Sequence, residues 1–174
     1  GLELMKQTQN VGLHALMEVN QILPWQDGKL GAFHIGFVLG PCLNASGRLD
    51  SAQRAMELLD SKTREAAVAQ AAFLKQLNDS RKEMTEEYVK IAVEMIESGP
   101  LKDDRVLVVF LPDCHESIAG IIAGRIRERY YRPTFVLTRG EEGVKGSARS
   151  IEGYHIYEEM TKCSSFFTKY GGHK

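Results

Sequence analysis

The chain has 174 residues, of which 43% are hydrophobic and 26% are charged, and its formal net charge is -1. This composition is typical of a globular protein and argues against disorder. The near-neutral charge excludes a uniformly basic surface, so any contact with nucleic acid has to come from a local patch. Residues 125–149 are the candidate, because they hold seven cationic and three acidic residues, a local excess of four positive charges.

Cysteine spacing and hydropathy indicate the compartment. Cys42, Cys114 and Cys163 are widely spaced and lack a C-x-x-C pairing, which argues against a disulfide framework or a zinc site. No apolar run approaches the roughly 20 residues that span a bilayer, and no basic-then-apolar leader opens the chain. A reduced, cytoplasmic protein without a membrane contact is expected. The chain starts without a methionine and stops after a Gly-Gly-His sequence, so we expect it to be a piece of a longer protein.

Residues 1–61 are expected to form a helical segment. Leu2 to Ile22 shows helical spacing and predicts a short helix pair, with Leu16 and Met17 on its apolar side. Pro24 is expected to close this pair, because proline does not continue a helix.

The next part of this segment contains proline and several polar residues. His34 to Leu39 is predicted to be a helical turn that Pro41 stops. The polar stretch LNASGRLD is then expected to lead into a helix from about Ser51 to Leu59, with Asp50 or Ser51 as its cap.

Residues 62–98 contain no proline or glycine and are rich in Ala, Glu, Lys, Gln and Met, so they predict one continuous helix of roughly 50 Å. Gly99 and Pro100 are expected to end it. We interpret this helix as a strut between two lobes, the second beginning near Leu101. The alternative is a coiled-coil arm, although the apolar spacing does not continue as a clean heptad. The expected divisions are therefore 1–61, 62–98 and 99–174.

The last part of the chain predicts a small α/β lobe with a mixed sheet. Arg105 to Leu111 is a continuous apolar run, typical of a strand that is covered on both faces. The elements expected after it are a helix over Ser117–Tyr130, a strand over Thr134–Thr138, a turn at Gly140–Gly143, a strand over Val144–Ser150 and a helix over Tyr154–Lys162. The fold class is therefore α/β, with a helical N-terminal part.

The loop PDCHES lies between the buried strand and the helix that follows it. Open α/β sheets usually bind their ligands at this position. The free N–H groups at the start of the helix favour an anion, and His115 adds a titratable donor there. The alternative is that His115 has no role in binding, as is common for a single histidine in a loop.

The stretch KGSARS places alternating side chains on the two faces of a strand. Lys145, Ser147 and Arg149 share one face, and two cations therefore flank one hydroxyl. This row suits the backbone of an extended nucleic acid, because arginine binds phosphate with two parallel hydrogen bonds. The alternative is a solvated edge strand whose charges prevent aggregation.

Two further polar sequences are weaker candidates. Gly171 and Gly172 let a ligand approach the backbone closely, with the imidazole of His173 beside them. In NASGR, Asn44 and Arg48 lie near a glycine, and a loop leading into a helix cap is the simpler interpretation.

Four stretches occur together in a characteristic order: LGPCLNASGRLDSA, CHESIAGIIAGRIRERYYRPTFVLT, VKGSARSIEGYHI and YGGHK. Together they resemble the RecJ family of the DHH phosphoesterase superfamily, over nearly the whole chain. The resemblance implies a 5′ to 3′ exonuclease specific for single-stranded DNA, with Mn²⁺ or Mg²⁺ bound by an N-terminal lobe. It also implies a long helix that leads to a DHH-associated lobe. The expected substrate-binding residues are Asn44, Arg48, His115, Lys145, Ser147, Arg149, Ser150, Gly171, Gly172 and His173.

The chain departs from the family pattern at the metal site. No Asp-His-His sequence occurs, and the five histidines are scattered. Hydrolysis with two metal ions needs carboxylates and imidazoles that hold the ions roughly 3.5 to 4 Å apart. We therefore expect no metal and no catalytic residue in this chain, which binds the substrate and does not cut it.

Two other functions remain open at this point. One is a phosphodiesterase of the same superfamily that acts on short oligonucleotides or cyclic dinucleotides. The other is a non-catalytic module that binds single strands. Single-stranded DNA is the expected partner, and single-strand-binding protein is a further expected partner of the intact system in DNA repair and recombination.

Overall fold

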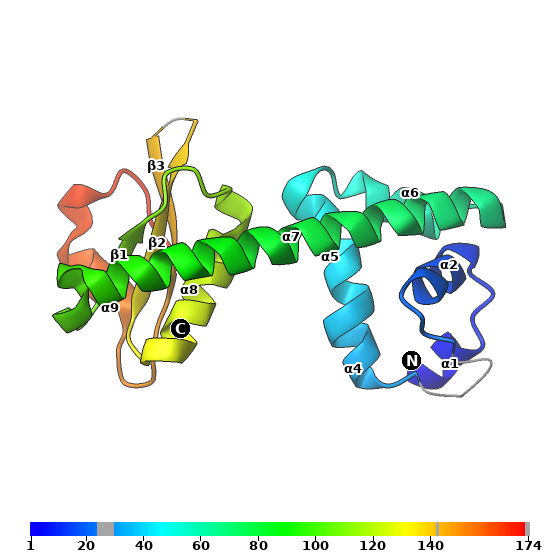
Figure 1. Ribbon diagram of the computed structural model, residues 1–174, viewed down its shortest axis with the longest axis horizontal. Helices are drawn as coiled ribbons and strands as arrows, with labels where there is room; N and C mark the ends of the chain where they lie inside the picture. The colour runs from blue at the N-terminus through cyan, green and yellow to red at the C-terminus, as the bar shows by residue number, and fades with distance from the viewer. Residues whose placement is uncertain (24–29, 142, 173–174) are drawn as a thin grey trace. The chain divides into compact units, whose positions relative to one another are not determined.

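The computed structural model describes residues 1–23, 30–141 and 143–172 (Figure 1). The chain is an α/β protein that divides into two compact units, Gly1–Glu83 and Met84–Lys174. The boundary lies inside the long helix α7 (Arg64–Ser98), so each unit contains one part of this helix. The expected divisions after residues 61 and 98 stay a prediction.

The described part of unit 1 is built from helices around one apolar core. Asn10 fixes the start of α2, because its side chain accepts a hydrogen bond from Leu13 N and donates one to the Leu59 carbonyl. Leu16, Met17 and Leu58 are fully buried in this core, which confirms the expected apolar side of the first helix pair. Pro24 lies outside the described residues. The elements are α1 (Leu2–Lys6), α2 (Val11–Val19), α4 (Ala32–His34), the π-helical turn η1 (Ile35–Leu39), α5 (Gly40–Leu49), α6 (Gln53–Leu59) and the first part of α7.

The sequence NASGR lies in a helix, which corrects the prediction of a polar stretch after Pro41. Pro41 occupies the first turn of α5, where a missing N–H group costs no helical hydrogen bond. The preceding π-helical turn η1 connects directly to α5, so the proline does not end the helical path. The N-cap of α6 is Ala52, which corrects the prediction of Asp50 or Ser51, although Ser51 Oγ accepts a hydrogen bond from Gln53 N at 3.2 Å.

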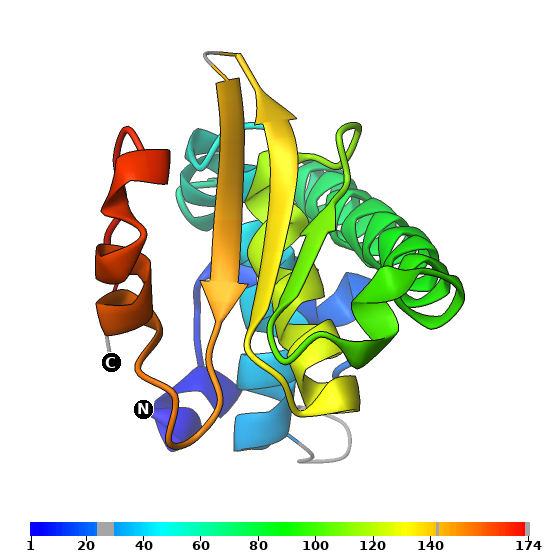
Figure 2. The same ribbon diagram turned by 90° about the vertical axis from the view of Figure 1, so that its left-hand side faces the viewer.

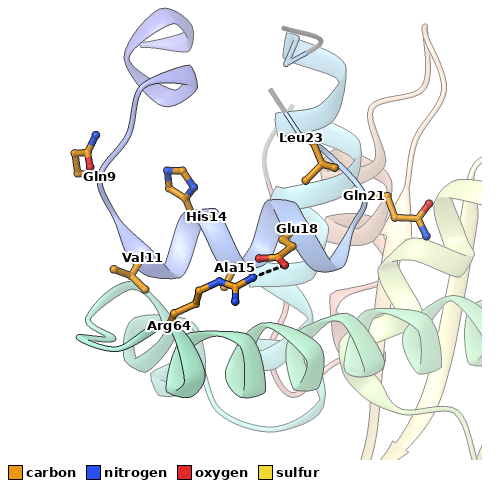
Figure 3. A pocket seen from close by; sticks show the side chains of 8 residues that line it. All are labelled: Gln9, Val11, His14, Ala15, Glu18, Gln21, Leu23 and Arg64. Carbon is orange, nitrogen blue, oxygen red and sulfur yellow. Dashed lines mark hydrogen bonds and ion pairs between the residues drawn. The ribbon is translucent and has the colours of Figure 1, made fainter. Parts of the chain in front are cut away.

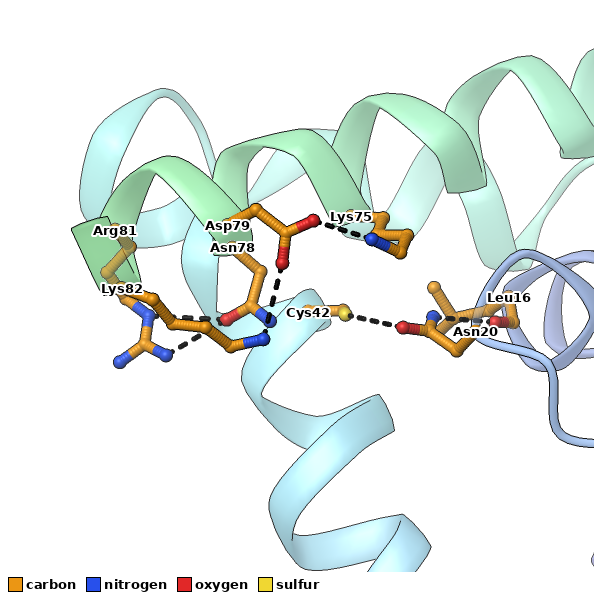
Figure 4. Close-up of polar contacts among 8 residues, drawn as sticks. All are labelled: Leu16, Asn20, Cys42, Lys75, Asn78, Asp79, Arg81 and Lys82. Atoms are coloured by element: carbon orange, nitrogen blue, oxygen red, sulfur yellow. Dashed lines mark hydrogen bonds and ion pairs between the residues drawn. The ribbon is translucent and has the colours of Figure 1, made fainter.

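The inner side of α5 is held by polar contacts as well as by apolar packing (Figure 4). The buried Cys42 thiol donates to Asn20 Oδ1 at 3.7 Å, and Asn20 Nδ2 donates to the Leu16 carbonyl at 2.8 Å. Burial raises the pKa of the Cys42 thiol, so it stays neutral. On the neighbouring surface of α7, Asp79 pairs with Lys75 at 2.6 Å and accepts from Lys82 at 3.2 Å. The Cys42–Asn20 contact therefore joins the buried side of α5 to the end of α2.

The long helix α7 agrees with the predicted helix over residues 62–98 to within two residues at its start. Ala67 and Leu74 are buried in the core of unit 1, whereas Ala92 and Ile96 are buried in the core of unit 2. The helix therefore packs within its own chain along both parts, which argues against the coiled-coil arm.

Unit 2 contains a three-stranded sheet with helices packed on it (Figure 2). The strand order is β1-β2-β3, with β1 parallel to β2 and β2 antiparallel to β3, which makes the predicted mixed sheet. The strands and the helices that were predicted in this lobe are all present, with shifts of one to two residues at most of their ends. The elements are η2 (Pro100–Asp103), β1 (Leu107–Phe110), α8 (Glu116–Tyr130), β2 (Thr134–Gly140), β3 (Gly143–Arg149), α9 (Ile156–Lys162) and η3 (Ser164–Phe166).

One face of the sheet is covered, not two, which corrects the prediction for β1. Leu107 and Val109 are fully buried against α8 and the second part of α7, whereas Val108 is 47% exposed and Phe110 is 43% exposed. An uninterrupted apolar run therefore does not require burial on both faces here.

Candidate substrate-binding site

His115 caps the N-terminus of α8. Its Nδ1 accepts a hydrogen bond from Ser117 N at 3.3 Å and lies 2.7 Å from Ser117 Oγ. Because Nδ1 accepts, the neutral ring carries its hydrogen on Nε2, which can donate to an anion. The prediction that His115 lies at the start of this helix is confirmed.

The loop that carries His115 is held from two sides of unit 2. The Tyr88 hydroxyl on α7 donates to the Asp113 carbonyl at 2.7 Å. From β2, the buried Thr138 hydroxyl donates to the Cys114 carbonyl. Cys114 is 3% exposed, and burial raises the pKa of its thiol to about 11. The position of His115 therefore follows from the packing of α7, β2 and the loop together.

Lys145, Ser147 and Arg149 lie on the side of the sheet that α8 covers, as the alternation of KGSARS predicted. Their register partners in β2 are Thr138, Val136 and Thr134, in that order, and all three are fully buried beneath α8. The two described edge strands of this sheet differ in the polarity of the face that the helices cover. On this face β3 carries the polar row along the N-terminal half of α8, whereas β1 contributes apolar side chains to the core. The row therefore lies next to the helix end that His115 caps.

Lys145 is bound to an acidic side chain. Its Nζ lies 2.8 Å from Glu116 Oε2, and about half of each side chain is exposed. The Lys145 ammonium holds the pKa of the Glu116 carboxyl below its usual range, so the carboxylate is charged at neutral pH. Glu116 thus places a negative charge in the first turn of α8, where a bound anion would also be stabilised. Glu116 and a phosphate would compete for this position.

Arg149 has neutral neighbours. Its Nη1 donates to the Ala148 carbonyl at 2.7 Å and lies 3.3 Å from Ser147 Oγ. Within residues 1–23, 30–141 and 143–172, no carboxylate lies within ion-pair distance of this guanidinium. Its charge is therefore available to an external anion, in contrast to that of Lys145. Ser147 lies beside it and adds a hydroxyl that can donate or accept.

The remaining predicted residues of unit 2 have different surroundings. The Ser150 hydroxyl donates to the Tyr154 carbonyl, so it stabilises the turn before α9. Gly171 and Gly172 are exposed, and a Cβ on either would have no neighbour within 4 Å. His173 lies outside the described residues. The Lys145–Glu116 ion pair joins the β3 row to the first turn of α8, directly after His115, whereas a Cβ on either of the two glycines would not come within 4 Å of that row.

Asn44 and Arg48 belong to unit 1. They are exposed and lie one turn apart on α5, whereas Cys42 and Ala45 of the same helix are buried. A shared surface for these two side chains could be derived from the spacing of four residues only once the segment was known to be helical.

A hollow of about 700 Å³ in unit 1 is lined by α2 and the start of α7 (Figure 3). Inside it, Glu18 pairs with Arg64 at 2.7 Å, and His14 Nε2 donates to the Thr8 carbonyl at 2.6 Å. None of the residues predicted to bind substrate lines this hollow, so it is separate from the candidate site.

The metal that the resemblance implies has no matching ligands in the described parts of this chain. Across residues 1–23, 30–141 and 143–172, no three His, Cys, Asp or Glu side chains lie close enough to hold an ion. Among the helices described, none is long and apolar enough to cross a membrane. The three cysteines are free thiols.

Two residues that matter at this site were not found from the sequence. Glu116 binds Lys145, and Gly120 lies beneath Ser147 and Arg149. Both contacts join α8 to β3 across 27 to 29 residues of sequence, so local patterns carried no signal for either.

Comparisons with known proteins agree with this architecture. Residues 103–174 match the DHHA1 domain family. The single-stranded-DNA-specific exonuclease RecJ of Bacillus subtilis is 36% identical over 178 residues, which cover 99% of this chain and 22% of that protein. The protein of the same name from Escherichia coli is 34% identical and covers 93% of this chain, which spans 29% of that relative.

A solved structure extends the likeness to the fold. The crystal structure of RecJ in complex with Mg²⁺ from Thermus thermophilus matches with a TM-score of 0.85 at 28% identity. The match covers 100% of this chain and 26% of that one. A second structure from the same organism, in complex with Mn²⁺, matches with a TM-score of 0.82. Residues 103–174 therefore match the DHHA1 domain family, and the chain is similar over nearly its whole length to one part of the RecJ exonucleases, of which it spans less than a third.

Proposed function

We propose that this chain is the substrate-binding portion of a RecJ-like 5′ to 3′ single-stranded DNA exonuclease, an enzyme of DNA repair and recombination that hydrolyses phosphodiester bonds with Mn²⁺ or Mg²⁺. The proposal places the metal ions in another lobe of a longer protein, as the family resemblance implies. This chain then binds the substrate and has no hydrolytic activity of its own.

The observation that carries the proposal is the ion pair between Lys145 of β3 and Glu116 of α8, which brings the β3 row to the helix end that His115 caps, in a chain similar to part of RecJ. The Arg149 charge meets no carboxylate in the described residues, and His115 directs an N–H donor from the first turn of α8. Ser147 adds a hydroxyl between the two cations of the strand. Arginine, hydroxyl and imidazole donors of this kind are the usual ligands of nucleic-acid phosphates.

Each proposed contact has its own role in binding the substrate. Arg149 binds a phosphate and offsets the negative charge that builds up on its oxygens during hydrolysis. His115, Ser147 and His173 donate to the oxygens of the same strand. Asn44 and Arg48 of unit 1 contact a further part of the substrate, and Gly171 and Gly172 allow the strand to approach the backbone. Lys145 contributes a positive charge next to Glu116.

Binding by this chain alone tests the proposal. A fluorescent single-stranded oligonucleotide should bind with an affinity that falls with salt, because each neutralised phosphate releases condensed counterions. Three to five phosphates give a slope of about -2 to -4 in a plot of log affinity against log salt. A slope near zero would count against phosphate recognition and favour a protein partner.

Digestion of end-labelled single-stranded DNA with added Mn²⁺ tests the division of labour. We expect hydrolysis by the longer protein that contains this chain and none by this chain alone. Cleavage by the isolated chain would contradict the proposal. If the longer protein cleaves only dinucleotides or cyclic dinucleotides, the related phosphodiesterase function replaces the exonuclease.

A further inference from the structure

Gly120 lies on α8, one turn after Glu116, with polar side-chain ends directly above it. A Cβ built on Gly120 would lie 2.8 Å from Arg149 Nη2, 2.8 Å from Ser147 Oγ and 3.5 Å from Arg149 Cζ. Real Cβ atoms do not approach other atoms within 3.0 Å, so these two side chains occupy space that only a glycine leaves open. The atoms above Gly120 belong to Arg149 and Ser147, two of the residues that are proposed to bind phosphate.

The second glycine of this helix provides a contrast. Gly124 lies one turn further along α8, and a Cβ on it would have no neighbour within 4 Å. Neither glycine adopts the left-handed backbone conformation that favours glycine over other residues. A glycine inside a helix is less stable than an alanine, so its presence at position 120 needs a reason other than backbone geometry. The space taken by the two side chains is such a reason.

The contact also sets the orientation of the guanidinium. Arg149 Nη1 donates to the Ala148 carbonyl at 2.7 Å and lies 3.3 Å from Ser147 Oγ, while Nη2 rests against the helix at Gly120. Three neighbours therefore fix a long side chain on an exposed edge strand. A side chain that is fixed before binding loses less conformational entropy when it binds a ligand.

We propose that Gly120 is a positioning residue for the phosphate contact, because its missing side chain lets Arg149 and Ser147 rest against α8 in a fixed orientation. The inference depends on the proposed function, in which Arg149 binds phosphate. A methyl group at position 120 meets the guanidinium end of Arg149 and the hydroxyl of Ser147, and its three nearest neighbours include no backbone atom. Alanine there should therefore preserve the fold, strengthen the helix and weaken binding of the nucleic acid. A purely structural role would lower stability and binding together.

Gly120→Ala and Gly124→Ala form a matched pair for the test. Both add a methyl group to the same helix, and only the first meets Arg149. Each variant is titrated with a fluorescent single-stranded oligonucleotide at several salt concentrations, and its thermal unfolding is recorded. Gly120→Ala should weaken binding roughly tenfold, as expected for one charge-assisted hydrogen bond, and should reduce the steepness of the salt dependence by about 0.7. Gly124→Ala should bind like the wild type, and neither variant should melt at a lower temperature.

Arg149→Ala and the double variant Gly120→Ala/Arg149→Ala complete the set. If Gly120 acts through Arg149, the double variant binds like Arg149→Ala alone. A further loss in the double variant would overturn the inference, and so would wild-type binding by Gly120→Ala while Arg149→Ala is impaired. A Gly120→Ala protein that melts well below Gly124→Ala would also overturn it, because the two side chains could not yield. If Arg149→Ala itself binds like the wild type, the proposed phosphate contact fails, whatever Gly120 does.

Discussion

Glu116, in the first turn of α8, lies 2.8 Å from the ammonium of Lys145. Lys145 belongs to the row of β3 residues that is proposed to bind phosphate. The carboxylate is charged at neutral pH, because the nearby ammonium lowers its pKa. Glu116 lies at the N-terminal end of the helix, which favours an anion. Its negative charge also offsets that of Lys145, one of the two cations in the row. A phosphate that binds here is repelled by the Glu116 carboxylate.

Glu116→Gln should consequently tighten the binding of single-stranded DNA. The amide keeps the size of the side chain and removes the negative charge beside Lys145 at the N-terminus of α8, so both the affinity and the steepness of its salt dependence should rise, the latter by about 0.7. Titration at several salt concentrations measures both quantities. The matched control is Lys145→Gln in the Glu116→Gln background, which should remove the gain. Weaker binding by Glu116→Gln would show that the ion pair itself organises the site.

Tyr88→Phe tests whether the loop of His115 must be held in place. The change removes the hydrogen bond from the Tyr88 hydroxyl to the Asp113 carbonyl and should cost about 1 kcal/mol of unfolding free energy. Tyr130→Phe is the control, because its hydroxyl donates to Glu97 at the same distance of 2.7 Å from the opposite end of α8. Chemical denaturation should show a loss for both, whereas oligonucleotide titration should show weaker binding for Tyr88→Phe alone. Equal binding by the two variants would show that the hydrogen bond to the His115 loop does not contribute to oligonucleotide binding.

Cys114 gives the fold a dependence on alkaline pH. Burial raises the pKa of its thiol from an ordinary value of 9.0 to about 11, so the unfolded chain loses this proton at a lower pH than the folded chain. Between pH 9 and 11 the unfolded state binds fewer protons, and stability falls as the pH rises, by at most about 1.4 kcal/mol per pH unit. Urea denaturation at pH 8.5 and pH 10 should show a steeper decline for the wild type than for Cys114→Ala. Parallel declines would mean that the thiol ionises while the protein is folded.

The sequence predicted the parts of this site that depend on local rules. Strand alternation placed Lys145, Ser147 and Arg149 on one face, and the start of the helix placed His115 at its cap, because both follow from the regular geometry of one element. The contacts of Glu116 and Gly120 were missed because they join two elements that are distant in sequence.

Two errors in the predicted fold have physical causes as well. Pro41 was interpreted as the end of a helix, whereas it lies in the first turn of α5, where proline is tolerated. The apolar run of β1 was interpreted as covered on both faces, yet Val108 and Phe110 are exposed because the helices cover one face only. Both errors concern which neighbours surround an element, and hydrophobic pattern alone does not determine this.

Arg149 is proposed to bind the phosphate on which hydrolysis takes place, so its replacement is also expected to affect catalysis. In the longer protein that contains this chain, Arg149→Ala should lower turnover of single-stranded DNA by about 30-fold to 1,000-fold. This range corresponds to roughly 2 to 4 kcal/mol of lost transition-state stabilisation, as for the loss of one oxyanion donor. Arg149→Lys should recover only part of the rate, because an ammonium cannot form two parallel hydrogen bonds. A variant that unfolds at the wild-type temperature and turns over at the wild-type rate would reject this role.

The most direct test of phosphate recognition is the salt dependence of single-stranded DNA binding by this chain, compared between the wild type and Arg149→Ala. The account predicts a slope of about -2 to -4 for the wild type and a slope less steep by about 0.7 for the variant, with lower affinity at every salt concentration. Identical slopes and affinities for the two proteins would contradict the claim that Arg149 binds a phosphate of the strand.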